Sequence, residues 1–334
     1  METTVEVVEQ SQVGQVRRLA LEFGRAQGLT EGDLGRAALV ATEVSTNLVK
    51  YGKGGAVTLN RFFDEGSVGI QLIAVDQGPG FPDFPASLRD GHSTSGTLGI
   101  GLGAMMRASD LFDTYTGAGQ GSAILSRVAR DRLGPAHSRA RLALGWRQAP
   151  KEGQMECGDG WAHASCGPWE RLCLVDGLGH GPLAAMASAT ALAIFRSAPE
   201  ADTPEDIIRK CHAGMNATRG AVMAVVAIDV AAGRLLFAGV GNIAAMVHSG
   251  EGSGHLLSTD GIVGHRLRKV RMSESGWAAG DTVVLSSDGL SGRWNLARYP
   301  GLLQRHALLV ASVLFRDFAR NTDDATVLVA RDLR

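Results

Sequence analysis

Aromatic residues and cysteine are scarce in this sequence, and long hydrophobic runs are absent. The 334 residues include 10 Phe, 5 Trp, 3 Tyr and 4 Cys, so aliphatic side chains must form most of any core. No Cys-x-x-Cys pair occurs, which argues against a structural zinc site and indicates reduced thiols. Without a signal sequence or a run of eighteen apolar residues, we expect a soluble, cytoplasmic protein.

Neither sign of charge dominates the chain. The 33 Lys and Arg residues nearly balance 34 Asp and Glu, which leaves no general field to attract nucleic acid or an anionic membrane. We therefore expect neither as a partner. Only residues 131–150 are basic, with four Arg against one Asp. The chain length predicts about two domains, and we place them at 1–130 and 142–334 with a linker at 131–141.

Apolar spacing predicts an α+β fold in both domains. In the first, the expected strands are 2–8, 56–63, 67–76, 111–116 and 121–129, and the expected helices are 11–27, 32–50 and 101–110. In the second, the expected strands are 141–148, 153–158, 170–176, 221–230, 233–239, 243–248, 282–287 and 325–331, and the expected helices are 181–197, 204–216 and 301–319. Many strands beside few helices indicate a two-sheet core with helices outside.

Two groups of polar residues in the first domain suit nucleotide chemistry. Glu43 and Asn47 are four positions apart in a predicted helix, so their side chains share one face. A carboxylate can take a proton from a hydroxyl, and an amide oxygen can ligate Mg²⁺. Asp76 ends a predicted strand, and Gly78 and Gly80 behind it let the backbone approach a ligand. Taken alone, the helix pair is more often a solvated helix face, and the strand end is as often an ordinary turn.

A third group is the glycine-rich segment that opens a predicted helix with Gly99, Gly101 and Gly103. Exposed amides at the start of a helix can hold phosphate oxygens. A dinucleotide-binding fingerprint needs a strand directly before its glycines, whereas a loop of about twenty residues precedes them here. The context therefore excludes a Rossmann fold.

In this order and spacing, the three groups resemble the N-box and the two glycine boxes of the GHKL ATPases, which have a Bergerat α/β sandwich. The segments DQGPG and TLGIGLGAMMRASDLFD are similar to those of anti-sigma-factor serine kinases of the RsbT switch-kinase type. The resemblance covers residues 1–130 and implies binding of ATP with Mg²⁺. It implies Glu43 as general base, Asn47 as magnesium ligand, Asp76 as adenine contact and residues 81–97 as a lid. The glycines that it places at the nucleotide are Gly78, Gly80, Gly99, Gly101 and Gly103.

Acidic residues at strand ends or beside glycines recur in the second domain. They are Asp159, Asp176, Asp288 and the pair Asp323-Asp324. Carboxylates that converge inside an apolar sandwich repel one another unless cations neutralise them. A site for two metal ions with oxygen ligands accounts for all of them, although any single one could belong to an unrelated Asp-Gly turn.

This order of motifs resembles the metal-dependent protein phosphatase (PPM) superfamily, in its bacterial SpoIIE branch. The resemblance covers about 142–334, where residues 218–247 are similar to RsbX-type phosphatases, and it implies a PPM-type α/β/β/α sandwich. It also implies that water attacks phosphoserine or phosphothreonine directly, with Asp176 and Asp288 as catalytic residues. The implied ligands of two Mn²⁺ or Mg²⁺ ions are Asp159, Asp176, the Gly177 carbonyl, Asp288 and Asp323.

Some neighbouring residues carry further expectations. His180 follows the predicted metal-binding loop and could donate a proton to the leaving hydroxyl or simply cap a helix. Arg219, Asn242 and Arg268 are placed near phosphate or substrate by the resemblance alone. Three cysteines are interpreted as small core residues rather than nucleophiles: Cys157, Cys166 and Cys173.

Together these expectations describe a bifunctional regulator. The first domain would phosphorylate Ser or Thr of a partner with ATP, and the second would remove the phosphate. The resemblance implies a STAS-domain anti-sigma-factor antagonist or stressosome protein as the partner, in a bacterial partner-switching or stress-response pathway. The alternative is a phosphatase alone, whose first domain holds nucleotide or a partner without phosphoryl transfer. The oligomeric state stays open.

Overall fold

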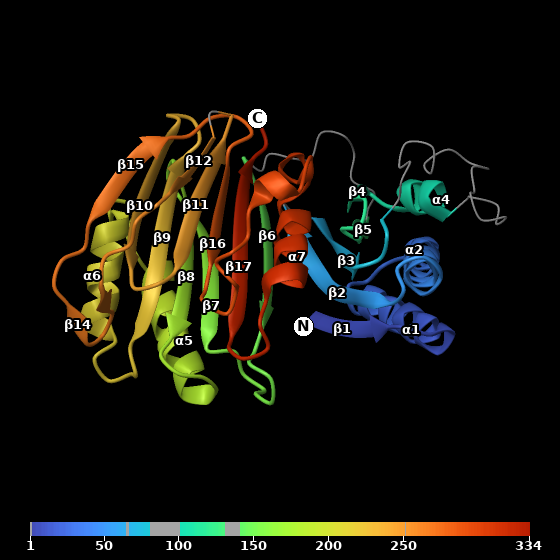
Figure 1. Cartoon of the computed structure of the whole chain (residues 1–334), viewed down its shortest axis with the longest axis horizontal. Helices are drawn as coiled ribbons and strands as arrows, with labels where there is room; N and C mark the ends of the chain where they lie inside the picture. Colours follow the sequence, from blue (N-terminus) through green and yellow to red (C-terminus); the bar gives the residue numbers. More distant parts are fainter. Residues whose placement is uncertain (1, 65–66, 81–100, 131–140, 251) are drawn as a thin grey trace. The chain divides into compact units, whose positions relative to one another are not determined.

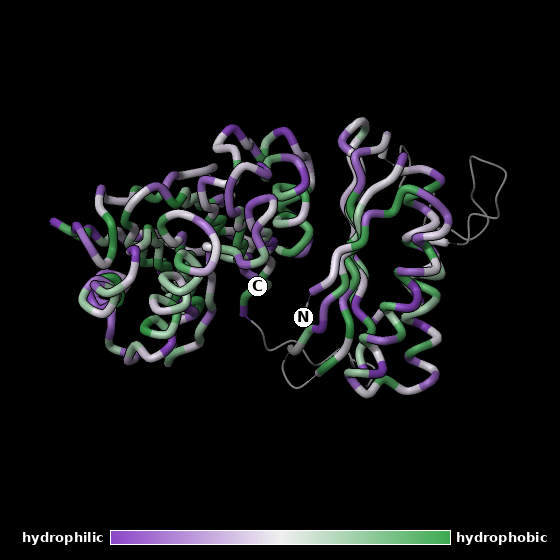
Figure 2. The backbone as a smooth tube through the Cα atoms, turned by 90° about the horizontal axis from the view of Figure 1, so that it is seen from below, coloured by the Kyte–Doolittle hydropathy of each residue, from purple (hydrophilic) through white to green (hydrophobic). Residues whose placement is uncertain are grey.

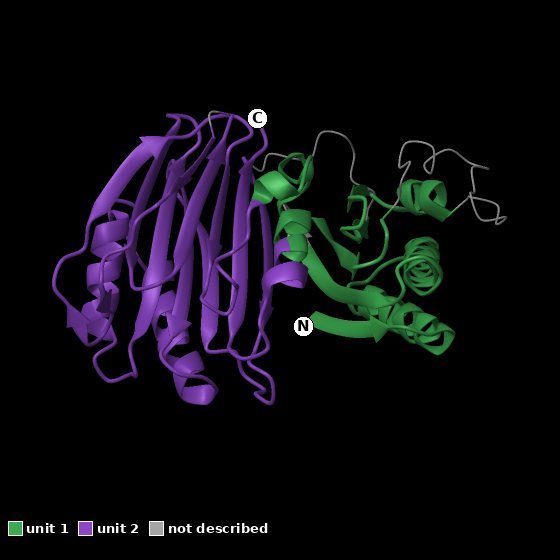
Figure 3. Cartoon of the chain, viewed as in Figure 1, with its two compact units in different colours: residues 1–140, 296–313 green, residues 141–295, 314–334 purple. Residues whose placement is uncertain are grey.

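The computed structural model of the chain divides into two compact units (Figure 3). It describes residues 2–64, 67–80, 101–130, 141–250 and 252–334. The first unit consists of residues 1–140 with 296–313, and the second of residues 141–295 with 314–334. Residues 131–140 lie outside the described residues, so the linker expected at 131–141 stays a prediction, as do the two domain boundaries.

The first unit is an antiparallel sheet with helices packed against it (Figure 2). The strand order is β1-β2-β3-β5-β4. The strands are β1 (Glu2–Val7), β2 (Gly55–Asp64), β3 (Ser67–Asp76), β4 (Leu111–Thr116) and β5 (Ser122–Ala129). The helices are α1 (Gln10–Ala26), α2 (Glu31–Lys50) and α4 (Gly101–Ala108). Buried aliphatic residues of the helices and strands form one shared core, which fixes α2 and the end of β3 in place.

Helix α2 carries Glu43 and Asn47, and its local sequence explains its position. The Thr30 hydroxyl accepts a hydrogen bond from the Asp33 amide at 3.2 Å, which caps the first turn. The buried residues recur at three- and four-residue spacing and face the sheet: Ala37, Val40, Ala41, Val44 and Leu48. Glu43 and Asn47 lie beside this stripe and are half-buried, so they remain available to a ligand.

The second unit contains two stacked five-stranded sheets (Figure 1). One has the order β15-β10-β9-β8-β7 and the other the order β12-β11-β16-β17-β6. The strands of the first are β7 (Asp159–Cys166), β8 (Trp169–Gly177), β9 (Ala221–Asp229), β10 (Arg234–Val240) and β15 (Met272–Gly276). Those of the second are β6 (Leu142–Ala149), β11 (Ala244–Ser249), β12 (Gly252–His255), β16 (Thr282–Ser286) and β17 (Ala325–Asp332). A small ribbon joins β13 (Gly261–Ile262) to β14 (Arg266–Leu267).

Helices cover the outer faces of the two sheets. Helices α5 (Pro182–Arg196) and α6 (Pro204–Gly214) pack on the β7–β10 sheet. At the other sheet, the Arg147 guanidinium of β6 lies 5.8 Å from the centre of the Phe315 ring, in the part of α7 (Ala307–Phe318) that belongs to the second unit. The predicted α+β class and the α/β/β/α layering are therefore confirmed. None of the helices in the described part of the chain is both long and apolar enough to cross a membrane.

Strand β9 shows how the layers are held together. Its even-numbered residues from Val222 to Ile228 pack between the two sheets, and its odd-numbered residues from Ala221 to Val225 pack under α5 and α6. Both faces of the strand are buried, as its nearly continuous aliphatic sequence predicts.

Some predicted elements are wrong. Residues 153–158 form no strand, because Gly153 adopts a φ of 82° and the Gln154 amide donates to the Lys151 carbonyl in a turn. Edge strands β12 and β15 escaped prediction, since all their described side chains are exposed and show no apolar alternation. The helix expected at 301–319 is shorter, and two short 3₁₀ turns, Leu296–Arg298 and Leu302–Gln304, precede it. The His306 ring accepts from the Leu308 amide at 3.1 Å and starts α7 there.

Candidate functional site

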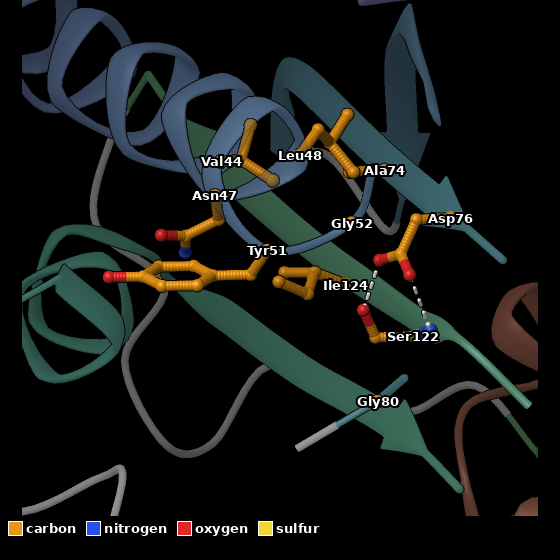
Figure 4. A pocket seen from close by; sticks show the side chains of 10 residues that line it. All are labelled: Val44, Asn47, Leu48, Tyr51, Gly52, Ala74, Asp76, Gly80, Ser122 and Ile124. Carbon is orange, nitrogen blue, oxygen red and sulfur yellow. Dashed lines mark hydrogen bonds between the residues drawn. The ribbon is translucent and has the colours of Figure 1, made fainter. Parts of the chain in front are cut away.

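A pocket in the first unit opens between α2 and the ends of β3 and β5 (Figure 4). Figure 4 shows Asn47 and Tyr51 extending from α2 over the pocket, while Asp76 and Ser122 face each other across the strands. The pocket combines an amide, a carboxylate and aliphatic walls, which suits a flat, polar-edged ligand. The full lining is Val44, Asn47, Leu48, Tyr51, Gly52, Ala74, Asp76, Gly80, Ser122 and Ile124.

Asp76 is held rigidly at the floor of this pocket. Its side chain is buried, and its Oδ1 accepts hydrogen bonds from the amides of Gly78 at 2.8 Å and Ser122 at 3.3 Å. The Ser122 hydroxyl donates to Oδ2. Sequence reasoning missed Ser122, although the residue stands directly opposite Asp76 in the β3–β5 register.

The glycines after Asp76 are required by close backbone packing. A Cβ atom at Gly78 would lie 2.9 Å from the Tyr51 carbonyl oxygen. Gly80 has a φ of +73°, and a side chain there would collide with the Gly117 carbonyl. The loop is therefore pressed against the end of α2, where its backbone borders the pocket.

The two residues predicted to share a face of α2 lie one turn apart on it and have different neighbours. Asn47 lines the pocket, whereas Glu43 lies next to the start of α4, where a Cβ atom at Gly101 would be 2.8 Å from its Oε2. Gly103 is buried two residues further along α4. Gly99 and the lid predicted at residues 81–97 lie outside the described residues.

The second candidate site is a group of carboxylates at one end of the two-sheet core. Asp159 and Asp176 stand directly opposite each other where β7 begins and β8 ends. The Ser287 hydroxyl, at the end of β16, donates to Asp159 Oδ2 at 2.7 Å. Asn242 donates through its amide to Oδ2 of the exposed Asp288 at 2.8 Å. Strand ends from both sheets thus bring together residues that are far apart in the sequence.

Asp324 joins this group as well, although we selected its neighbour Asp323 from the sequence. Asp323 is exposed, whereas Asp324 is only 3% exposed, and its Oδ1 accepts from the Lys151 amide at 2.9 Å. In the described part of the chain, nothing forms a hydrogen bond with its Oδ2. The one available signal was position: Asp324 immediately precedes the aliphatic run of β17 and so had to be buried.

The electrostatic effect of this grouping is large. Burial, and then the charges of Asp159, Asp288, Asp323 and Asp324, raise the pKa of Asp176 to about 8. Burial also raises the pKa of Asp159 to about 6, against the opposing effect of the hydrogen bond from Ser287. Asp176 therefore feels the charges of the other carboxylates and retains its proton at neutral pH unless positive charge is supplied.

Two observations indicate that cations suit this group. Among the residues that the structure describes, the buried oxygens Asp159 Oδ1 and Asp324 Oδ2 have no hydrogen-bond partner, and hard cations take carboxylate oxygens as ligands. Gly177 can carry no side chain, because a Cβ atom would collide with the Ala184 carbonyl, so its backbone stays close to the group. In the described part of the chain, no three acidic, His or Cys side chains already stand close enough together to hold a metal ion.

Other predicted residues lie around the carboxylates. A Cβ atom at Gly179 would be 2.9 Å from Nη1 of Arg219, so this guanidinium lies against the loop after Asp176. His180 is exposed in the same loop. All four cysteines are free thiols; Cys173 and Cys211 are buried, and Cys157 and Cys166 are half-buried. Burial raises the pKa of the Cys157 and Cys211 thiols, which keeps them in the unreactive protonated form.

Comparison with known proteins divides the chain in the same order. Residues 7–126 match the family model "Histidine kinase-like ATPase domain", and residues 170–332 match "Stage II sporulation protein E (SpoIIE)". The serine/threonine-protein kinase RsbT of Bacillus subtilis (strain 168) is 32% identical over 123 residues, which are 37% of this chain and 92% of RsbT. The phosphoserine phosphatase RsbX of the same organism is 30% identical over 146 residues, 43% of this chain and 72% of RsbX.

Solved structures add a likeness in three dimensions. A structure from work on the bacterial stressosome, described as a modular system adapted to control secondary messenger signaling, has a TM-score of 0.54 at 31% identity. The match covers 57% of this chain and all of that one. The crystal structure of RsbX in complex with magnesium has a TM-score of 0.52 at 22% identity, over 57% of this chain and 95% of RsbX, and shows the shared fold.

Proposed function

The chain belongs to the histidine kinase-like ATPase family in its N-terminal part and to the SpoIIE family in its C-terminal part, and on this premise we propose that it both adds and removes a phosphoryl group on one partner protein. The N-terminal part transfers the γ-phosphoryl group of ATP to Ser or Thr. The C-terminal part hydrolyses the resulting phosphoester. Similarity to RsbT and RsbX in one chain supports a partner of the STAS-domain anti-sigma-factor antagonist or stressosome type.

The carboxylate group carries the phosphatase half of the proposal. Two divalent ions, Mn²⁺ or Mg²⁺, would be held by Asp159, Asp176, the Gly177 carbonyl, Asp288 and Asp323, and the raised pKa of Asp176 supports a need for positive charge there. When bound, such ions neutralise the carboxylates and polarise the phosphoryl group. The chain's own residues hold the ligands in place: Ser287 orients Asp159, and Asn242 orients Asp288.

The pocket beside α2 supports the kinase half. Asp76 offers a fixed carboxylate to the amino group of a nucleotide base, and Asn47 offers an amide oxygen to a magnesium ion on the phosphates. Gly101 starts α4, whose first amides suit phosphate oxygens, and it lies against Glu43. Glu43 is therefore near the end of the site where a general base would accept the proton of the attacking hydroxyl.

One experiment tests both halves together. The purified chain is incubated with ATP, Mg²⁺ and a STAS-domain protein encoded beside its gene, and phosphosites are mapped by mass spectrometry. We expect one phosphorylated Ser or Thr, which disappears when Mn²⁺ is added without ATP. A STAS protein that is never phosphorylated contradicts the kinase half, and a phosphosite that survives Mn²⁺ contradicts the phosphatase half.

A second candidate function, in which only the C-terminal part is an enzyme, rests on the pocket alone. Its lining residues Asn47 and Asp76 provide for nucleotide binding and not for phosphoryl transfer. The first unit would then bind nucleotide as a regulatory module without transferring phosphate. ATP binding by the chain, together with no phosphorylation of any STAS protein tested, would select this alternative.

A further inference from the structure

The solvent face of α5 is unusual for an exposed helix. From Pro182 to Phe195 the helix contains no charged residue, and the first charge is Arg196 at its last position. Leu183 and Met186 point into solvent with 48% of their surface exposed. A helix that is apolar on every side normally lies buried. This helix instead leaves one apolar face exposed to solvent.

A third exposed apolar side chain belongs to a loop that is held against the start of α5. Met155, in the loop between β6 and β7, is 97% exposed. The Gln154 side chain of this loop lies against Gly181, at the start of α5. A Cβ atom added at Gly181 would be only 2.7 Å from Gln154 Oε1. The Lys151 amide also anchors the loop to Asp324 at 2.9 Å. Met155 is thus presented by a held loop rather than by a free end, and we call Met155, Leu183 and Met186 the apolar patch.

The apolar patch adjoins the carboxylate group directly. Ala184 lies between Leu183 and Met186, and its carbonyl packs against Gly177. A Cβ atom added at Gly158 would lie 2.8 Å from the Cβ of Ala184. Both glycines are next to site carboxylates, Asp176 and Asp159. When a phosphorylated residue of a protein reaches these carboxylates, the protein surface around that residue therefore lies over the first turn of α5.

From this arrangement we propose that the apolar patch docks the phosphorylated protein substrate, and that the substrate is a folded domain with an apolar surface beside its phosphosite. The proposal rests on the proposed phosphatase function. Glu152 and Glu156 are exposed on either side of Met155, so the matching surface of the substrate carries basic residues around its apolar centre. Methionine side chains are flexible and adapt their shape to a partner. Such side chains suit a surface that binds the substrate protein transiently and then releases it.

The test compares substrates that need the patch with substrates that do not. The double variant L183Q/M186Q keeps long side chains that favour a helix. Its Mn²⁺-dependent hydrolysis is measured on a folded phosphorylated STAS-domain protein, on a short phosphopeptide with the same phosphosite, and on p-nitrophenyl phosphate. We expect KM for the phosphoprotein to rise roughly tenfold, with both small substrates hydrolysed as by the wild type. The single variant M155Q should act in the same direction, with a smaller rise.

The matched control is Leu333→Gln. Leu333 is 45% exposed and follows β17 at the end opposite Asp323 and Asp324, so its replacement should change no rate. The docking proposal is overturned if L183Q/M186Q hydrolyses the phosphoprotein like the wild type, or loses all three activities equally. It is overturned in favour of self-association if sedimentation shows a wild-type dimer that L183Q/M186Q abolishes. A wild type inactive on every phosphate substrate overturns the proposed phosphatase function instead.

Discussion

At the scale of the residue, the carboxylate group is defined by unequal burial. Asp159 and Asp324 are buried, Asp176 is half-buried, and Asp288 and Asp323 are exposed. A buried carboxylate depends on its neighbours to become ionised, whereas an exposed one is stabilised by water. The inner residues should therefore govern whether cations bind, and the outer ones should be easier to replace without damage to the fold.

Asp288→Ala tests the phosphatase site with little risk to folding, because Asp288 is exposed. We expect Mn²⁺-dependent dephosphorylation of the STAS partner to be lost while the N-terminal kinase stays active, so that phosphorylated partner accumulates. The wild type in excess chelator should lose the same activity and regain it with added metal. Dephosphorylation that persists in chelator, or an Asp288→Ala variant at the wild-type rate, contradicts a two-metal site.

The nucleotide pocket separates binding from transfer at two positions. Asn47 lines the pocket and Glu43 does not, so Asn47→Ala should weaken binding of Mg-ATP, whereas Glu43→Ala should bind ATP normally and transfer no phosphate. Calorimetric titration and phosphorylation of the STAS partner measure the two effects. Full phosphorylation by Glu43→Ala, in a preparation free of other kinases, rejects its role as general base.

At the scale of the element, the kinase half depends on the start of α2. The Thr30 hydroxyl caps the helix by accepting from the Asp33 amide, and removal of such a cap typically costs about 1 kcal/mol. Thr30→Ala should therefore lower the free energy of unfolding of the first unit by about that amount, as urea denaturation would measure. Thr42→Ala, the same change inside α2, is the control. It should cost less, because alanine favours the helix interior, and equal losses would contradict the capping role.

At the scale of the whole molecule, proteolysis tests the division into two domains. The sequence 131–141 contains Arg132, Arg139 and Arg141 together with a Gly-Pro pair, so trypsin should cut there first and leave two folded fragments. Mass spectrometry of the early products identifies the cut. First cleavage inside residues 1–125 or 160–330 would show that the predicted boundary is misplaced.

The stability of the metal-free chain should depend on pH through Asp176. Its carboxyl group ionises at about 8 in the folded protein, against an ordinary pKa of 3.8. Between these values the unfolded chain binds fewer protons than the folded one, so the free energy of unfolding falls as pH rises from about 4 to about 8. Thermal unfolding in chelator at pH 5 and pH 8 measures the fall. The variant Asp176→Asn should show a smaller fall, and parallel curves for both proteins would contradict this account.

The sequence by itself determined most of the architecture and both families. Period-two and period-3.6 patterns placed α1, α2 and most buried strands, although not β7, because these elements bury one or both faces in an apolar core. The order of Glu43, Asn47, Asp76 and the later aspartates indicated both families, since each chemistry needs particular side chains at particular strand and helix ends. The exposed strands β12 and β15 gave no such pattern, because none of their side chains is buried.

Only the tertiary structure decided which of these residues meet, and in what environment. Asp159 and Asp176 are paired by the β7–β8 register, and Asp324 enters the group from the start of β17 in the other sheet. Ser122 reaches Asp76 across two neighbouring strands. The apolar face of α5 also became meaningful only when Leu183 and Met186 proved to be exposed. Burial and electrostatic coupling depend on distances in space, and the spacing of residues along the chain does not fix those distances.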